Sequence, residues 1–345
     1  MAESSPFIFK LSSEALVKVL EFLDYNSLQS FRKTCHHARN VLSTTPVKLN
    51  HSTIMIFFSP KGIEITWSSK WNGCYVVNFS QKDNDCLVKF RGERNLGSGF
   101  LDILAEKRKL LIDASMVDVA FYEYKCLLKH QKGEIRRFSI RHKFDGQQSI
   151  SASLPTLLKF RDNLMDYMAS RKMKLQMQDF DAYVLDESYV MAFLPYVKPT
   201  KHNIFQLKMP AGQKINKIVG TTTWKKIETF RTEVTIDTSL VNFFHFRHAR
   251  MALRTMSLSE LIQFKNVLCE DPTIPKVCIS IECTNFDREG DNKFTQLGHP
   301  VKMNGSARTW HFDTALPSVR LQLYHCDNLY SFTSPDSFKK RDRTF

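Results

Sequence analysis

The stretch Leu11-Ser-Ser-Glu-Ala-Leu-Val-Lys-Val-Leu-Glu-Phe-Leu-Asp24 decides the fold of the amino-terminal part of the chain. Its apolar residues at positions i, i+3, i+4 and i+7 line one face of a predicted helix: Leu16, Val19, Leu20 and Leu23. Ser12 or Ser13 can cap the start of this helix. After a break at 24–27, the helical spacing returns and predicts a second helix that ends near Pro46. We therefore expect a compact helical hairpin over the first fifty residues.

Beyond residue 47 the chain changes to short β-branched and aromatic runs that are separated by turn residues. The first of these runs predict the strands of a small meander at 53–58, 63–67, 75–79 and 86–90. Residues 101–128 are expected to be mostly helical, up to a break at 129–133. Later strand-like runs lie at 135–140, 174–180, 204–209, 233–236, 277–281 and 319–324.

Helical patterns alternate with those later strands and cover 154–170, 187–196 and 257–269. A capping-box pattern, Ser257 with Glu260, opens the last of them. This alternation predicts β-α units with a largely parallel sheet. We expect an α+β or α/β fold, in which a small helical domain precedes a β-rich connecting segment and the alternating units. The irregular strand spacing permits an open, curved, leucine-rich-repeat-like array as well as a single compact sheet.

Composition and charge narrow the class of protein. The chain has 345 residues, of which 43% are hydrophobic and 24% charged, as is typical of globular proteins. Its 49 Lys and Arg against 35 Asp and Glu give a net charge of +14, which favours acidic partners. The eight cysteines are spread along a chain too large to need disulfide bonds, which suits a reducing compartment. With no signal-peptide pattern and no bilayer-spanning apolar run, we expect a cytoplasmic or nuclear protein without a membrane partner.

One constellation of residues has the chemistry of a zinc site. His245 and His248 stand three apart, and Cys278 and Cys283 follow them in the sequence. The two cysteines lie five apart on a predicted strand and so point to opposite faces, which favours buried thiols and no metal site. Nucleophile elbows, phosphate loops and paired helical carboxylates are missing from the sequence. We therefore expect no catalytic residue, no cofactor and no enzymatic activity.

Basic clusters with neighbouring aromatic residues suggest an alternative role in binding single-stranded RNA. These clusters are Arg136-Arg137-Phe138, Trp224-Lys-Lys226 and Phe246-Arg-His248. The competing interpretation is that the aromatic rings fill a core while the basic side chains are solvated. We favour that interpretation and keep RNA as the alternative partner.

The amino-terminal stretch resembles the F-box. That motif reads Leu-Pro-x-Glu, then an aliphatic helix ending in Leu-Asp, a Leu four residues on and a Cys seven further. The resemblance covers residues 7–46, and Ser12 and Ala38 depart from the usual Pro and Trp. It implies binding to a Skp-family adaptor through Leu11, Ser12, Glu14, Leu16, Val19, Leu20, Leu23, Leu28, Phe31 and Cys35.

The rest of the chain resembles nematode F-box proteins that carry an FTH domain. The matching motifs come in the family's order: Arg32-Lys33-Thr-Cys35-His, Leu127-Leu-Lys-His-Gln-Lys132, Phe138-Ser-Ile140, Phe193-Leu-Pro-Tyr-Val197 and Phe244-His-Phe246. We assign the FTH domain to 118–270, a β-rich connecting segment with a helix to 47–117, and a β segment with a charged tail to 271–345. The resemblance implies the substrate receptor of an SCF-type cullin ubiquitin ligase, which binds an adaptor and an unknown target protein.

The size of the helical segment agrees with that implication. About forty residues bury too little apolar surface to be stable alone, so the stripe must pack against something. An adaptor groove is one partner for it, and the protein's own body is the other. A scaffold or RNA-associated protein that uses its F-box outside a ligase is the alternative function.

Overall fold

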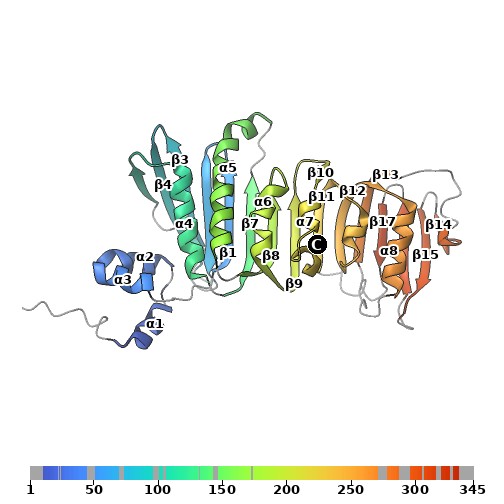
Figure 1. Cartoon of the computed structure of the whole chain (residues 1–345), viewed down its shortest axis with the longest axis horizontal. Helices are drawn as coiled ribbons and strands as arrows, with labels where there is room; N and C mark the ends of the chain where they lie inside the picture. The colour runs from blue at the N-terminus through green and yellow to red at the C-terminus, as the bar shows by residue number, and fades with distance from the viewer. Residues whose placement is uncertain are drawn as a thin grey trace, which may run out of the picture. The chain divides into compact units, whose positions relative to one another are not determined.

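The computed structural model describes residues 11–21, 23, 25–44, 51–69, 74–95, 101–103, 106–131, 133–142, 147–171, 174–270, 278–286, 296–304, 307–315, 320–326 and 329–333. The chain divides into two compact units, residues 1–177 and 178–345 (Figure 1). Within the described residues, the helices are all too short or too polar to cross a membrane.

The first unit opens with helices α1 (Ser13–Glu21), α2 (Tyr25–Thr34) and α3 (His36–Thr44). The backbone N–H of Ala15 donates to Ser12 Oγ at 3.2 Å, so Ser12 caps α1 as predicted. The prediction of one second helix is wrong, because the chain turns at Cys35 and starts α3. The Cys35 sulfur accepts the N–H of Ala38 at 3.3 Å and thereby satisfies an amide at the start of α3.

An antiparallel meander follows, as predicted, through β1 (His51–Ser59), β2 (Gly62–Ser69), β3 (Cys74–Lys82) and β4 (Asp85–Asn95). The expected helix over 101–128 is wrong in its first part. That part forms β5 (Leu101–Ile103) and β6 (Lys107–Leu111), both paired antiparallel with β4. Backbone pairing with β4 decides the structure of β6, since most of its side chains are exposed and offer no apolar helical face.

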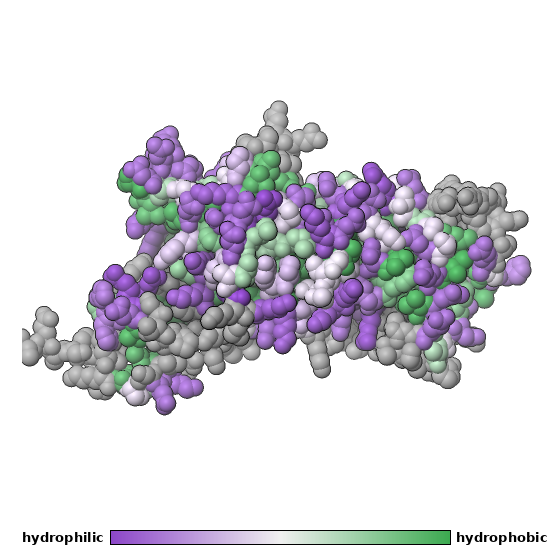
Figure 2. All heavy atoms as spheres, viewed as in Figure 1, coloured by the Kyte–Doolittle hydropathy of each residue, from purple (hydrophilic) through white to green (hydrophobic). Residues whose placement is uncertain are grey.

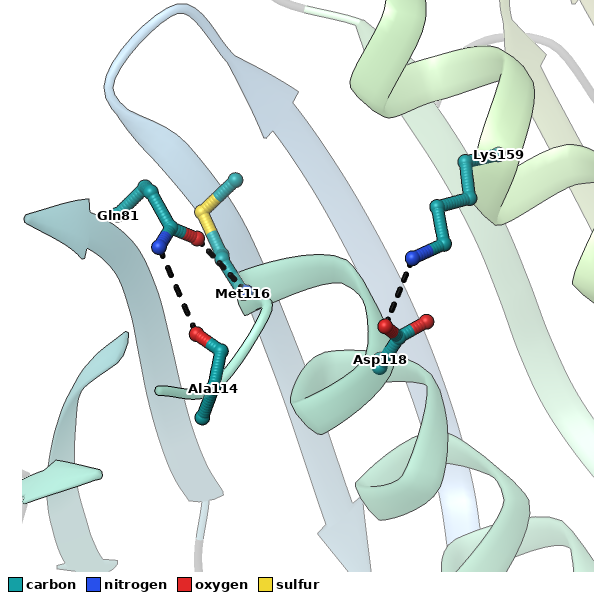
Figure 3. Close-up of polar contacts among 5 residues, drawn as sticks. All are labelled: Gln81, Ala114, Met116, Asp118 and Lys159. Carbon is teal, nitrogen blue, oxygen red and sulfur yellow. Dashed lines mark hydrogen bonds and ion pairs between the residues drawn. The ribbon is translucent and has the colours of Figure 1, made fainter. Parts of the chain in front are cut away.

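Helix α4 (Met116–His130) is fixed to the sheet and to α5 (Gln147–Ser170) by polar contacts (Figure 3). The side chain of Gln81 on β3 accepts the N–H of Met116 at 2.8 Å and donates to the carbonyl of Ala114 at 3.5 Å. Gln81 therefore supplies the cap that Ser115 does not make with its own side chain. Asp118 on α4 pairs with Lys159 on α5 at 2.7 Å.

Strand β7 (Ile135–His142) pairs in parallel with β1, and α5 leads on to β8 (Leu175–Tyr183). The helices bury aromatic side chains against this sheet. Tyr124 of α4 and Phe160 of α5 are almost fully buried and contact each other at a centroid distance of 6.0 Å. The ring centroids of Phe138 on β7 and Tyr124 lie 6.5 Å apart, so the predicted strand 135–140 contributes to the core.

The second unit contains a series of neighbouring parallel strands. Its parallel strands run in chain order, each paired with the next: β9 (Val197–Lys208), β11 (Thr229–Asp237), β12 (His248–Met256) and β13 (Cys278–Phe286). Short β10 (Gln213–Lys214) joins the edge of β11 beside β9. The prediction of β-α units is confirmed here, and the strand β12 was missed.

Helical segments lie between these strands. They are α6 (Glu187–Met191), α7 (Asn216–Val219), α8 (Leu258–Glu270) and the 3-10 turns η2 (Leu194–Tyr196), η3 (Trp224–Lys226) and η4 (Leu240–Phe243). The capping box that opens α8 forms as predicted, because Ser257 N–H donates to Glu260 Oε2 at 2.9 Å and Glu260 N–H donates to Ser257 Oγ at 3.2 Å.

The sheet of the second unit ends in antiparallel strands, which corrects the expectation of a largely parallel sheet to a mixed one. Strand β17 (Leu329–Thr333) pairs with β13, and then β16 (Arg320–Cys326), β15 (Ala307–Asp313) and β14 (Lys302–Asn304) follow outward. Helix α8 lies on one face of these strands (Figure 1). There the ring centroids of Phe264 and Phe332 are 5.3 Å apart. The curved, leucine-rich-repeat-like array stays a prediction.

Candidate functional site

The amino-terminal helices form a small hydrophobic core of their own. Its described members are Leu16, Leu20, Leu28, Ala38 and Leu42, and none exposes more than 7% of its surface. Ala38, at a position where the F-box pattern commonly has Trp, is fully buried. The apolar stripe recognised in the sequence therefore serves the domain's own packing, at least in part.

The predicted adaptor-binding residues fall into three groups by burial. Leu16, Leu20 and Leu28 are buried, and Leu11, Leu23, Phe31 and Cys35 are half-buried. Ser12, Glu14 and Val19 are exposed. Val19 keeps 38% of its surface exposed next to the fully buried Leu20, so one predicted stripe contains both core and surface positions.

Two of these residues have a structural role that sequence reasoning did not give them. Ser12 caps α1 and Cys35 caps α3, as described above. A side-chain oxygen or sulfur at these places satisfies helix amides that would otherwise lack a partner. The departure from Pro at Ser12 therefore replaces a conformational restraint with a hydrogen bond.

A polar contact joins the helical domain to the sheet part of the same unit. The Arg32 guanidinium on α2 donates to the hydroxyl of Tyr122 on α4 at 3.3 Å. This hydrogen bond raises the pKa of Arg32, against the opposing effect of burial. Burial also raises the pKa of the nearby Cys126 thiol, which keeps it protonated and unreactive at neutral pH. Sequence patterns carried no signal for this contact, since the two helices are far apart in the chain.

The structure does not bring His245, His248, Cys278 and Cys283 together as a zinc site. His248 and Cys278 are neighbours in the β12–β13 register, but Cys283 is buried on the opposite face of β13. The ring of His245 is hydrogen-bonded to the carbonyl of Trp224 at 3.0 Å. Within the described part of the chain, no three His, Cys, Asp or Glu side chains are grouped to hold a metal ion.

The aromatic residues of the three RNA-like clusters are core residues. Phe138, Trp224 and Phe246 each expose at most 1% of their surface. The indole N–H of Trp224 donates to the carbonyl of Asn242 at 3.0 Å, so both its ring and its polar atom are used internally. Because these rings are buried, they are not available to stack on RNA bases. The structure supports the interpretation that they fill the core.

Comparison with known protein families gives two matches. An F-box domain matches residues 8–50, which contain α1, α2 and α3, and an FTH domain matches residues 158–293, which extend from within α5 to beyond β13. Comparisons with curated proteins and with solved structures give no match. The chain therefore contains an F-box domain and an FTH domain.

Proposed function

We propose that this protein is the substrate receptor of an SCF-type cullin ubiquitin ligase. Its F-box binds a Skp-family adaptor, and the unit that contains most of the FTH domain binds a target protein. Such a receptor needs no catalytic group, because it acts by raising the concentration of target lysines near the ubiquitin donor. The proposal includes four segments, an F-box at 7–46, a connecting segment at 47–117, the FTH domain at 118–270 and a C-terminal β segment at 271–345. It also includes an open arrangement of the β-α units and a cytoplasmic or nuclear location.

The observation that carries the proposal is the surface of α1. A domain this small has few apolar side chains to spare, yet Val19 stays exposed beside a core residue, together with the exposed Ser12 and Glu14. An amphipathic helix that leaves apolar surface outside its own core is suited to a partner groove. The F-box match at 8–50 supports a Skp-family adaptor as that partner.

The test must separate binding from folding. Replacing Leu20 with Asp would bury a carboxylate in the core and unfold the domain, so loss of binding would be uninformative. Val19→Asp places the charge on the surface instead. The matched control is Val301→Asp, since Val301 is also exposed, at 59%, and lies outside the F-box.

We expect Val19→Asp to weaken binding of a purified Skp-family adaptor at least tenfold in calorimetry, with an unchanged circular dichroism spectrum. Val301→Asp should bind as the wild type does. Undiminished adaptor binding by a folded Val19→Asp variant would remove α1 from the interface.

Ligase assembly has its own test. The tagged full chain, isolated from cells, should bring down the adaptor together with a cullin. Recovery of adaptor-free protein with bound RNA would favour the alternative, a scaffold or RNA-associated protein that uses its F-box outside a ligase.

A further inference from the structure

Strand β6 forms one edge of the sheet in the first unit. Within the described residues its register partners are all on β4, and the sheet continues from β4 inward to β3, β2 and β1. The side of β6 that faces away from β4 therefore presents backbone N–H and C=O groups that no described strand pairs with. Such an edge can pair with an extended segment of another chain.

The edge is held in place along its length and at its end. The whole of Lys107–Leu111 is in register with β4. Just beyond the strand, the N–H of Asp113 donates to Asp85 Oδ1 at 3.0 Å. The side chain of Gln81 donates to the next carbonyl, that of Ala114 (Figure 3). A fixed edge has little conformational freedom to lose when a partner strand joins it.

The side chains of β6 differ between its two faces. Side chains alternate along a strand, so Lys107 and Lys109 point to one face, and Arg108 and Leu110 point to the other. Leu110 keeps 45% of its surface exposed, and Ile112, just past the strand, keeps 68%. Figure 2 shows hydrophobic side chains next to hydrophilic ones at the end of the first unit that carries β3 and β4. The edge therefore offers basic groups on one face and apolar surface on the other.

The basic groups on this edge differ in whether the protein already uses them. Arg108 pairs with Glu106, and this hydrogen bond, together with the charges of neighbouring basic side chains, lowers the pKa of Glu106 against the opposing effect of desolvation. Among the described residues, the ammonium groups of Lys107 and Lys109 make no ion pair or hydrogen bond. The two lysines are exposed and are available to a partner.

The same lysines decide which strand can join the edge. A second copy of the chain, paired antiparallel through β6 at full overlap, would place Lys109 directly opposite Lys109, and like charges in that position destabilise a sheet. A segment with acidic residues at alternate positions places its carboxylates beside Lys107 and Lys109 instead. Its intervening residues, where apolar, lie beside Leu110 and cover exposed hydrophobic surface.

We propose that the outer edge of β6 binds an extended segment of a partner protein in which acidic and apolar residues alternate. The segment joins the sheet as an added strand, held by backbone hydrogen bonds, and the two lysines select its acidic residues. This edge lies between the F-box match at 8–50 and the FTH match at 158–293. The inference goes beyond the proposed receptor function and does not depend on it.

The experiment uses the purified full chain and the fluorescein-labelled peptide Thr-Val-Glu-Val-Glu-Val-Thr. This sequence reads the same in both directions, so it suits parallel and antiparallel pairing alike. We expect it to bind about tenfold or more tightly, in fluorescence anisotropy, than the same peptide with Lys in place of Glu. Lys107→Glu combined with Lys109→Glu should reverse that preference. The control Lys225→Glu with Lys226→Glu, at two exposed lysines of the second unit, makes the same change in net charge and should leave the preference unaltered.

Two N-methylated peptides test the strand pairing itself. Successive residues of a strand direct their N–H groups to opposite edges, so methylation of the Glu nitrogens blocks one edge of the peptide and methylation of the Val nitrogens blocks the other. One of the two peptides should lose binding, and the other should keep it. The neutral variant Lys107→Gln with Lys109→Gln should also weaken binding of the Glu peptide, and it replaces the charge reversal if that variant has a lowered melting temperature.

The outcomes separate the competing explanations. Equal binding of the Glu and Lys peptides overturns the proposal, as does a preference that survives the substitutions at Lys107 and Lys109. Full binding of both N-methylated peptides would exclude strand addition. A single-stranded RNA oligonucleotide that binds more tightly than the peptide, and loses binding in the same variants, would assign the edge to nucleic acid and also overturn the proposal. A dimer in analytical ultracentrifugation that the Glu peptide dissociates would assign the edge to a second copy of the chain instead.

Discussion

Replacing Leu20 with Ala tests whether the F-box is stabilised by its own hydrophobic core. Leu20 is fully buried, so the substitution leaves a cavity and costs about 3 kcal/mol within the usual range of about 2–5 kcal/mol. The hydrophobic core of a helical domain of about forty residues rarely supplies more than roughly 3–5 kcal/mol of stability. A loss of about 3 kcal/mol raises the unfolded population of the domain by about a hundredfold, at about tenfold per 1.4 kcal/mol.

The measurement is hydrogen exchange of the full chain, read by mass spectrometry peptide by peptide. In Leu20→Ala, amides of 13–44 should exchange about a hundredfold faster than in the wild type, while those of 229–256 stay unchanged. The matched change Val19→Ala, one residue earlier on the exposed side, should alter exchange less than about threefold. Unchanged exchange over 13–44 in Leu20→Ala would refute the autonomous core, and accelerated exchange over 51–142 would show that the domain is not separable from the sheet.

Three further predictions concern single features. Ser12→Ala should lower the stability of the F-box by about 1 kcal/mol in the same exchange experiment, because α1 loses its cap; equal protection in both proteins would contradict the capping role. Burial opposes ionisation of Glu260, but hydrogen bonds from Ser239 and Ser257 outweigh it and lower the pKa of this carboxyl. Its contribution to stability is therefore present above the ordinary pKa of about 4.3 and lost as the pH falls through the folded value, so Glu260→Gln should show a shallower loss of melting temperature in acid than the wild type. Trp224→Ala should cost about 3–5 kcal/mol in urea denaturation, as a core residue does, and a near-neutral effect would reopen the RNA interpretation.

Local patterns predicted the elements that depend on local sequence. The α1 cap, the meander of β1 to β4 and the capping box of α8 follow from spacing and turn chemistry within a few residues. The structure of β6 depends on β4, a partner some twenty residues earlier, and its basic sequence gave no sign of that pairing. Strand β12 did carry a signal, the alternation of Ala249, Met251 and Leu253 on the buried face, which the sequence analysis overlooked.

The site was less predictable than the fold. Leu16, Val19 and Leu20 share one stripe, and the sequence alone does not tell which of them the packing of α2 and α3 will cover. The placement of Arg231 beside Arg250 depends on the register between β11, which was expected to start only at 233, and β12, which was missed. Neighbours across a sheet are set by tertiary structure, and a single sequence does not contain their register in readable form.

The alternation along β11 and β12 has a consequence for how this protein can change over generations. Residues such as Phe230 and Met251 hold the unit together, while Arg231 and Arg250 between them face outward. Substitutions at outward positions usually alter stability by no more than about 0.5 kcal/mol. Substitutions can thus change the outward face of these strands while the buried residues that stabilise the fold stay unchanged.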